Sequence, residues 1–435
     1  MASRGKLSRW LKLAGMSGSV ASGYAGNRLL SALGFDRQGG RLNATHARAG
    51  SRIARTLGEL KGPVMKMGQM ASIAADMLPV EIAEPLATLR KDAPPVGYEV
   101  IAAQLERELG QPPERLFSSF EREPFAAASI GQVHRAVTDD GRDVAVKVQY
   151  PGVDRSVDAD LAHMKLAMRV AGLWRRRPES FERFFAEVAE RLHDELDYTH
   201  EAANARLLGE YHRDHDFVRV PEVVGERSAQ RVLTLTYLGG DPIERARQYP
   251  SEARDRIGEN VIRMLYGEIF GLGALHADPN PANFAFAPDG SFALYDFGAV
   301  KRFADPELRG LRGVVLGAMQ RDYAAIEQGM RELKARDLEG PPVKPEVYAE
   351  WRELLAPALD GDEPYDFGAS TLHREAIAML PRYREQVRSF RLPIGLMLVQ
   401  RTNVGHFGNL RYLAARVRVG RVLRECLDLA EPRLP

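Results

Sequence analysis

The pattern of hydrophobic and polar positions predicts three parts in the chain. Over residues 45–92, apolar side chains recur at every third or fourth position, which is typical of helices packed on one face. Pro94-Pro95 ends this region, and a short helix is expected between it and Pro112-Pro113. We therefore predict a basic N-terminal segment and a helical extension over residues 1–115.

After residue 125 the pattern becomes that of a small sheet. Strands are expected at 130–137 and 143–149, then near 218–224 and 231–237, with helical periodicity from 154 to about 208 between the two pairs. These elements predict a lobe over 116–238. The remainder, 239–435, is expected to be helical apart from a short strand pair around Phe284 and Leu294, so the fold class is α+β with two lobes.

Three polar residues in the second lobe have the order and spacing of a phosphoryl-transfer site. Asp278 is followed five residues later by Asn283, and Asp296-Phe297-Gly298 comes after the apolar run 292–295. In protein kinases the first Asp is the catalytic base, while the Asn and the second Asp hold Mg²⁺. We predict Asp278 as the catalytic residue and Asn283 and Asp296 as the metal ligands. Each residue alone would more often be a helix cap or a turn residue.

A lysine on the second expected strand completes this set. In Val144-Ala145-Val146-Lys147, alternation places the valines on one face and Lys147 on the other, toward the cleft. A lysine that points inward needs an anion, and Glu201 on the following helix is the candidate partner. Both are predicted to take part in catalysis by ordering the phosphates.

The glycine-rich loop expected before this lysine is absent, and an alanine-rich segment replaces it. The predicted nucleotide-binding residues are Ala126, Ala127, Ala128, Ser129, Ile130, Gly131, Gln132 and Lys147, with Thr236, Tyr237 and Leu238 as the hinge. Alanine still allows a phosphate to approach closely, but it makes the loop stiffer than glycine does. At the hinge, adenine contacts are expected to be mostly to the backbone.

Four motifs together resemble the UbiB-like (AarF-type) atypical kinase family, which includes the coenzyme Q biosynthesis kinase-like proteins. They are the alanine-rich loop, Lys66-Met67-Gly68-Gln69, Glu195-x-Asp197 and His276-Ala277-Asp278-Pro279, and the resemblance covers residues 45–305 well. It implies a protein-kinase-like fold whose helical N-terminal extension lies over the cleft. It also implies ATP (or ADP) and Mg²⁺ as cofactors, and a gating set in which Lys66 and Gln69 meet Glu195 and Asp197. Asn280 and Ala282 stand where the family commonly has His and Gly, which puts the loop's geometry in question.

Charge and composition bear on partners and location. The first 58 residues carry ten Lys or Arg against one acidic residue, Asp36, although the whole chain has a net charge of +1. Such a segment can contact an anionic membrane surface, and a solvated arm packed on an acidic body is an equal alternative. Apolar stretches near Ile262 and Leu396 are interrupted by Glu268 and Arg401, so no membrane span is predicted. With a single cysteine, the chain suits a reducing compartment, and we expect a cytoplasmic protein, peripheral to the inner face of the membrane if the basic segment binds lipid.

Three functional hypotheses follow. The first is an ATP-dependent atypical kinase or ATPase of the UbiB-like family that supports ubiquinone biosynthesis, with a lipid or quinone precursor and quinone-biosynthesis proteins as partners and no nucleic acid. The second is a non-catalytic, nucleotide-gated lipid-binding or scaffold protein. The third, an aminoglycoside phosphotransferase-like enzyme, does not explain the segment from Lys66 to Gln69. Helical periodicity resumes at Asp305-Pro306 and no Ala-Pro-Glu follows, which argues against a peptide substrate platform.

Overall fold

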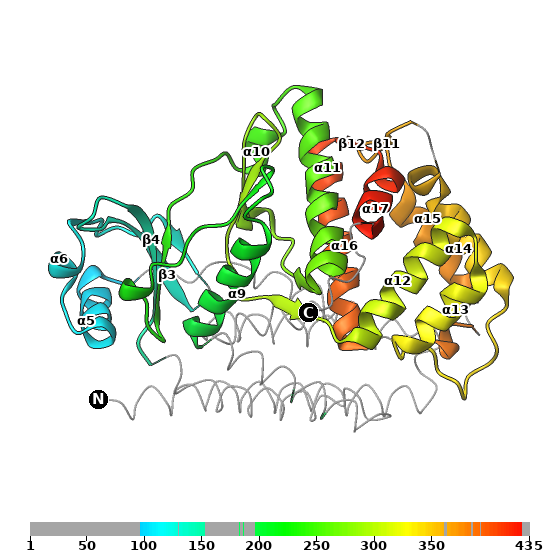
Figure 1. Ribbon diagram of the computed structural model, residues 1–435, viewed down its shortest axis with the longest axis horizontal. Helices are drawn as coiled ribbons and strands as arrows, with labels where there is room; N and C mark the ends of the chain where they lie inside the picture. The colour runs from blue at the N-terminus through cyan, green and yellow to red at the C-terminus, as the bar shows by residue number, and fades with distance from the viewer. Residues whose placement is uncertain are drawn as a thin grey trace, which may run out of the picture. The chain divides into compact units, whose positions relative to one another are not determined.

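The computed structural model describes residues 96–128, 130–152, 196–360, 363–383, 386–391 and 393–428, together with Glu182 and Ala186. By its internal contacts the chain divides into two compact units (Figure 1). The first consists of Met1–Ala203 and Val223–Tyr237, and the second of Asn204–Glu222 and Leu238–Pro435. The predicted helical extension over the cleft, and most of the predicted helix from residue 154 onward, lie outside the described residues.

The first unit is built on a small antiparallel sheet in the order β1-β3-β4-β6, with β2 also paired to β3. The elements described in it are α5 (Tyr98–Leu109), α6 (Pro113–Leu116), β1 (Ser119–Phe120), β2 (Ala126–Ala127), β3 (Gly131–Val137), β4 (Asp143–Gln149), η3 (Gly225–Arg227) and β6 (Val232–Thr236). Helix α9 (Tyr198–Tyr211) begins in this unit and ends in the second. The strands predicted at 130–137, 143–149 and 231–237 match β3, β4 and β6 to within one residue at each end.

One face of this sheet forms a core. Val144, Val146 and Val148 of β4 are fully buried, and so are Ile101 and Leu105 of the contacting helix α5. Burying a side chain of this size contributes about 1.5–3 kcal/mol. The alternation predicted for this strand is therefore confirmed, and Lys147 lies on the opposite face from the valines.

The second unit is mostly helical in its described residues, which form three short sheets. Its elements are β5 (Val218–Arg219), α10 (Ile243–Ala246), α11 (Ser251–Gly267), the π-helix η4 (Glu268–Leu272), β7 (Ala274–His276), η5 (Pro281–Asn283), β8 (Phe284–Phe286), β9 (Phe292–Leu294), β10 (Val300–Arg302), α12 (Asp305–Gln320), α13 (Tyr323–Glu332), α14 (Pro345–Leu359), β11 (Tyr365–Asp366), α15 (Leu372–Met379), η6 (Leu380–Tyr383), η7 (Gln386–Ser389), α16 (Ile394–Leu413), β12 (Arg416–Val417) and α17 (Val419–Asp428). Helices α11 and α16 contact each other (Figure 1).

The predicted strand pair near residues 284 and 294 is confirmed as β8 and β9, and β5 joins it in parallel. The expectation that everything else in this part is helical was wrong. Strands β7 and β10 pair with each other, as do β11 and β12. Each of these strands has only two or three residues, too few for an alternating pattern to be visible in the sequence.

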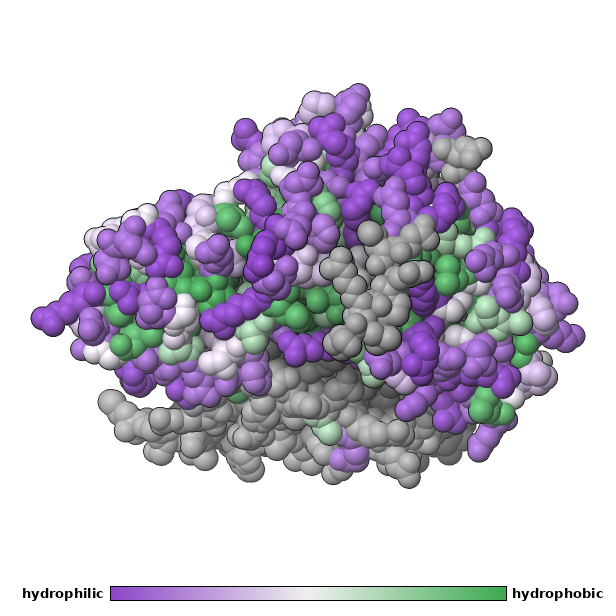
Figure 2. All heavy atoms as spheres, viewed as in Figure 1, coloured by the Kyte–Doolittle hydropathy of each residue, from purple (hydrophilic) through white to green (hydrophobic). Residues whose placement is uncertain are grey.

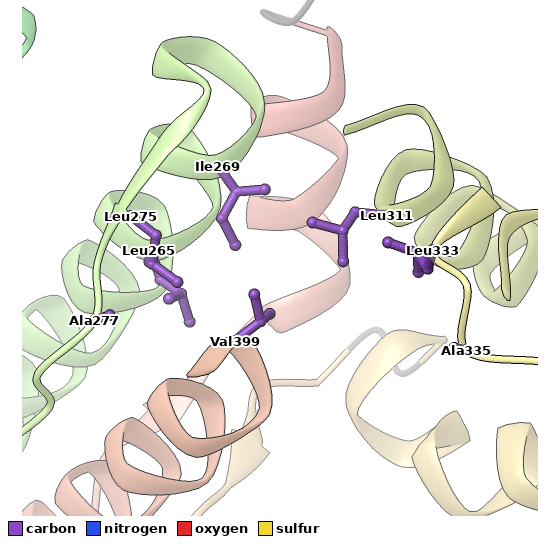
Figure 3. Close-up of a cluster of buried hydrophobic side chains, with 8 residues drawn as sticks. All are labelled: Leu265, Ile269, Leu275, Ala277, Leu311, Leu333, Ala335 and Val399. Atoms are coloured by element: carbon purple, nitrogen blue, oxygen red, sulfur yellow. The ribbon is translucent and has the colours of Figure 1, made fainter. Parts of the chain in front are cut away.

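A hydrophobic cluster supports the part of this unit that follows α11. Its members come from α11, η4, β7 and the residue after it, α12, α16 and the segment after α13 (Figure 3), and they are Leu265, Ile269, Leu275, Ala277, Leu311, Leu333, Ala335 and Val399. Ala277 directly precedes the predicted catalytic residue Asp278. The loop that carries Asp278 therefore starts from a packed core.

Hydrophilic side chains cover most of the described surface on the face shown in Figure 2. Of the helices in the described part of the chain, none combines the length and the apolar character needed to cross a membrane.

Candidate functional site

Lys147 and Glu201 form a close ion pair in the first unit. The Lys147 ammonium donates to both carboxylate oxygens of Glu201, at 2.7 and 2.8 Å. The side chains are 15% and 7% exposed, and the ammonium also lies 5.1 Å from the centre of the Tyr198 ring. Register places Lys147 between Val133 of β3 and Leu233 of β6 in the sheet. The structure thus brings together two residues 54 positions apart that the sequence predicted as partners.

The alanine-rich segment forms a tight turn that leads into β3. The backbone N–H of Ala128 donates to the carbonyl of Gly131 at 2.9 Å, and the carbonyl of buried Ile130 accepts from Tyr150 at 2.9 Å. A Cβ atom at Gly131 would overlap the carbonyl oxygen of Val148, so this position requires glycine. Ala126 and Ala127 form β2, and Ser129 lies outside the described residues.

Gln132 lies on the face of the sheet opposite Lys147, because its register partner is Val148 and not Lys147. Its fully buried side chain accepts from the Val96 N–H at 2.9 Å and donates to His134 Nε2, also at 2.9 Å. The other ring nitrogen of His134 donates to the Glu121 carbonyl at 2.7 Å. A role for Gln132 in nucleotide binding therefore rests on its backbone, since the side chain belongs to this internal network.

The hinge residues leave the sheet with their backbone held. Thr236 is the last residue of β6, and the N–H of Tyr237 donates to the Asp143 carbonyl at 2.8 Å. The Tyr237 ring lies under the Arg135 guanidinium, 3.6 Å from the ring centre. Leu238 belongs to the second unit, where its carbonyl accepts from the Tyr295 hydroxyl.

Of the four predicted gating residues, only Asp197 is described. Its carboxylate accepts from the N–H and the hydroxyl of Thr199, at 2.9 and 2.6 Å, at the first turn of α9. Burial acts to raise the pKa of Asp197, but these hydrogen bonds outweigh it and the pKa lies below its usual value. Asp197 thus caps a helix in this structure, and its gating role stays a prediction. Lys66, Gln69 and Glu195 lie outside the described residues.

Asp278 lies in the second unit on the loop between β7 and η5, and polar contacts reach both of its carboxylate oxygens. Oδ2 accepts from the Asn283 amide at 3.0 Å. Oδ1 lies 3.3 Å from the Asn280 N–H and 3.4 Å from the Arg401 guanidinium. Because Asn283 donates to Asp278 through Nδ2, its amide oxygen points away from Asp278. That oxygen is the atom with which Asn283 would bind a metal ion. The 3₁₀ turn Pro281–Asn283, capped by the Asn280 side chain, sets this geometry.

Asp296 is held in an uncommon backbone conformation, with φ of 57°. Non-glycine residues adopt this left-handed region rarely, and they do so mainly where the surroundings fix it. Here the His276 ring donates from Nε2 to the Asp296 carbonyl at 2.9 Å, and the next side chain, Phe297, is fully buried. Asn204 of α9 donates to the Phe297 carbonyl at 3.0 Å. The backbone that carries the second predicted metal ligand is therefore fixed on both sides.

Two residues near this loop were not identified as functional from the sequence, where they appeared only as polar interruptions of apolar stretches. Glu268 is fully buried, and its carboxyl group contacts His212 Nε2 at 3.0 Å and accepts from the His276 N–H at 2.7 Å. Arg401, on α16, contacts Asp278 as described above. The signal that could have identified them is the presence of a charged residue inside an otherwise apolar helix, since burying a charge requires a partner.

An Mg²⁺ ion fits the side chains present at the second-unit site. Asn283 and Asp296 offer an amide oxygen and a carboxylate, which are the hard oxygen ligands that Mg²⁺ takes together with phosphates and water. Among the described residues, no group of three His, Cys, Asp or Glu side chains has the arrangement of a metal site. A metal held by one Asn, one Asp and nucleotide phosphates does not need such a group.

Fold and site together define a protein of the protein-kinase-like class. The description "ABC1 atypical kinase-like domain" belongs to the family model that matches residues 88–330. This match covers more than half of the chain, so the chain belongs to the ABC1 atypical kinase-like family, as the resemblance noted in the sequence predicted.

Individual proteins agree with this assignment. The chain is 34% identical over 282 residues to Protein ACTIVITY OF BC1 COMPLEX KINASE 7, chloroplastic, of Arabidopsis thaliana, an alignment that covers 63% of this chain and 40% of that protein. It is 31% identical over 337 residues to Atypical kinase coq-8, mitochondrial, of Caenorhabditis elegans, covering 76% of this chain and 44% of that protein. The chain thus spans less than half the length of these two relatives. Rv3197 of Mycobacterium tuberculosis, solved in complex with erythromycin, is similar in structure with a TM-score of 0.63 and 31% identity, over 86% of this chain and 95% of that one.

Proposed function

We propose that the protein is a Mg²⁺-dependent atypical kinase or ATPase that supports isoprenoid-quinone (ubiquinone) biosynthesis at a membrane surface. The observation that carries the ATP-dependent part is the Lys147–Glu201 pair, at 2.7 Å. A largely buried lysine held by a buried carboxylate is the arrangement that kinases use to order the α and β phosphates. The resemblance to coenzyme Q biosynthesis kinase-like proteins supports the proposed role in ubiquinone biosynthesis.

Each residue has a distinct role in this proposal. Lys147, positioned by Glu201, contacts the phosphates of ATP, and Asn283 and Asp296 hold Mg²⁺, which neutralises phosphate charge. Asp278 orients the attacking water or hydroxyl group and accepts its proton. Asn283 holds one of its carboxylate oxygens, and the Asn280 N–H and the Arg401 guanidinium lie near the other. The carboxylate therefore needs little reorganisation before the reaction.

The basic N-terminal segment is the proposed membrane contact. Its ten Lys or Arg in 58 residues would bind anionic lipid and place the protein close to apolar quinone precursors. The proposed ligand is a lipid-linked phenol, and the proposed partners are other quinone-biosynthesis proteins. We do not propose a nucleic-acid partner.

Mg²⁺-ATP turnover by the full chain tests this function. We expect phosphate release that increases with anionic liposomes and with quinone-precursor-like phenols. Asp278→Asn should lower turnover about 10²–10⁴-fold, the range of a general base, and leave Mg²⁺-ATP binding in place. Asp214→Asn, at an exposed aspartate, is the matched control. Unchanged turnover in Asp278→Asn would refute the catalytic assignment, and tight binding with no turnover in the wild type would favour a nucleotide-gated lipid-binding or scaffold protein.

A further inference from the structure

Helix α16 contacts every residue of the loop segment Ala277–Pro279. The Arg401 guanidinium lies 3.4 Å from Asp278 Oδ1, and the Asn409 amide donates to the Pro279 carbonyl at 2.8 Å. The Thr402 hydroxyl is shared between its own helix, at 2.8 Å from the Leu398 carbonyl, and the Ala277 carbonyl at 3.3 Å. All of these contacts lie within the second unit.

Gly405 makes the closest approach. A Cβ atom at this position would overlap the Pro279 ring, so a side chain of any size would push the helix and the loop apart. At Gly408, one turn further along the same helix, a Cβ atom would meet nothing within 4 Å. Glycine in a helix interior is about 1 kcal/mol less favourable than alanine, so its presence needs a physical reason. The close contact with Pro279 gives that reason at Gly405, whereas Gly408 has no such contact.

The contacting residues lie on one stripe of the helix. Arg401, Gly405 and Asn409 are spaced i, i+4 and i+8, and Thr402 comes three positions before Gly405 and seven before Asn409, so all four lie on one side of the helix. Packing in the hydrophobic core does not account for them. Val399 belongs to the core cluster shown in Figure 3, and Leu410 is also buried, but the stripe itself is polar or lacks a side chain.

We infer that α16 is a clamp for the catalytic loop and that Arg401 is the positioning residue for Asp278. The α16 clamp consists of Arg401, Thr402, Gly405 and Asn409. It lies outside residues 88–330, the part of the chain that the family model matches. The catalytic consequence of the clamp rests on the proposed function, whereas its effect on the loop does not.

Orientation, and not stability, is the contribution of Arg401. The side chains of Arg401 and Asp278 are 31% and 26% exposed, and an ion pair this accessible to solvent contributes at most about 1 kcal/mol to folding. Its effect on the reaction can be much larger, because displacing a catalytic group by about 1 Å can cost about 10²-fold in rate. Together with Asn283 on Oδ2, the guanidinium near Oδ1 fixes the plane of the carboxylate.

The first experiment compares Gly405→Ala with Gly408→Ala in the full chain by hydrogen–deuterium exchange of residues 276–283. We expect faster exchange of the loop amides in Gly405→Ala, because the added methyl group displaces Pro279, and wild-type exchange in Gly408→Ala. Thermal unfolding of both variants shows whether either has lost its fold. Equal loop exchange in the two variants would overturn the clamp. This readout needs no turnover, so it decides the clamp even if the proposed function fails.

The second experiment compares Arg401→Gln with Arg411→Gln, an exposed arginine on the same helix. We expect Arg401→Gln to lower kcat for Mg²⁺-ATP about 10–100-fold with KM unchanged, Arg401→Lys to restore part of the rate, and Arg411→Gln to match the wild type. In an Asp278→Asn background, Arg401→Gln should lower the residual rate no further, because Arg401 acts through Asp278. If Arg401→Gln raises KM and leaves kcat unchanged, Arg401 contacts the nucleotide and does not position Asp278. If the Arg401 and Arg411 variants behave alike, Arg401 has no positioning role.

Discussion

The two units hold their functional side chains in different ways. In the first, Lys147 and Glu201 are largely buried and neutralise each other directly, on a strand and a helix of the core. In the second, Asp278 is about a quarter exposed and lies on a loop, oriented by Asn283 and Arg401. A buried pair links function to the stability of its unit, whereas a solvated loop residue can lose its function while the fold stays intact.

The largest expected effect is on stability in the first unit. Lys147→Met leaves the Glu201 carboxylate buried without its cation, and we expect it to lower the free energy of unfolding by about 3–5 kcal/mol. Asp278→Asn, which removes a more exposed charge, should cost about 1 kcal/mol or less. Urea unfolding of the full chain, monitored by circular dichroism, measures the stability of both variants.

A double variant separates the buried charge from the loss of packing. Lys147→Met combined with Glu201→Leu should recover most of the lost stability, because no unpaired charge remains in the core. It should not recover Mg²⁺-ATP turnover. If Lys147→Met costs no more stability than Asp278→Asn, the contrast between a buried pair and a solvated loop is wrong.

Glycine contacts sharpen the same contrast. A Cβ atom at Gly131 would overlap the Val148 carbonyl on the neighbouring strand, where a paired backbone cannot move aside. We expect Gly131→Ala to lower the free energy of unfolding by about 1–3 kcal/mol, the range of overpacked cores. Gly405→Ala meets a loop residue instead and should cost less stability while moving the loop. Gly97→Ala, where nothing lies within 4 Å, is the control.

The response to acid should also distinguish the units. Burial lowers the pKa of His406 to about 3, with a further contribution from the nearby His276. The unfolded chain, with the usual His pKa of about 6.5, then binds more protons than the folded chain between pH 6.5 and 3, so stability is lost as the pH falls through that window. We expect the second unit to lose on the order of 2 kcal/mol between pH 7 and 5.

His406→Gln should remove most of this pH dependence, as measured by urea unfolding at both pH values. In the first unit, burial also lowers the pKa of His134, but its hydrogen bond to the Glu121 carbonyl acts in the opposite direction. His134→Gln should therefore change the pH dependence less than His406→Gln does. The reverse order would mean that the ring of His406 is reached by solvent.

The residues that could be predicted from the sequence are those whose geometry follows from local spacing. Alternation along one strand placed Lys147 opposite the valines, and the five-residue interval from Asp278 to Asn283 is enough for a short turn to bring them together. The strands β3, β4 and β6 and the helix at Asp305 were predicted because each has several periodic positions. Strands β7, β10, β11 and β12, with two or three residues each, have too few, and they were missed.

Contacts that depend on pairing between distant segments could not be predicted. Gln132 was grouped with the nucleotide loop by its position, but its side chain faces the opposite way, because register pairs Val133 with Lys147. Arg401 is separated from Asp278 by 123 positions, and no local pattern links α16 to the loop. Glu268 reaches the His276 N–H because a π-helix and the strand that follows bring the chain back on itself.

The smallest expected effect is at the hinge, where the Arg135 guanidinium lies over the Tyr237 ring and 3.1 Å from Asp143. Arg135→Gln should lower the free energy of unfolding by about 1 kcal/mol or less, because these groups are partly solvated. Nucleotide affinity should stay within about twofold, since the Tyr237 N–H is held by the Asp143 carbonyl of the sheet and adenine is expected to contact the backbone. Calorimetric titration with Mg²⁺-ADP measures the affinity, with Arg142→Gln, in the turn between β3 and β4, as the control. A tenfold loss confined to Arg135→Gln would show that the ring, and not the backbone, forms the hinge contact.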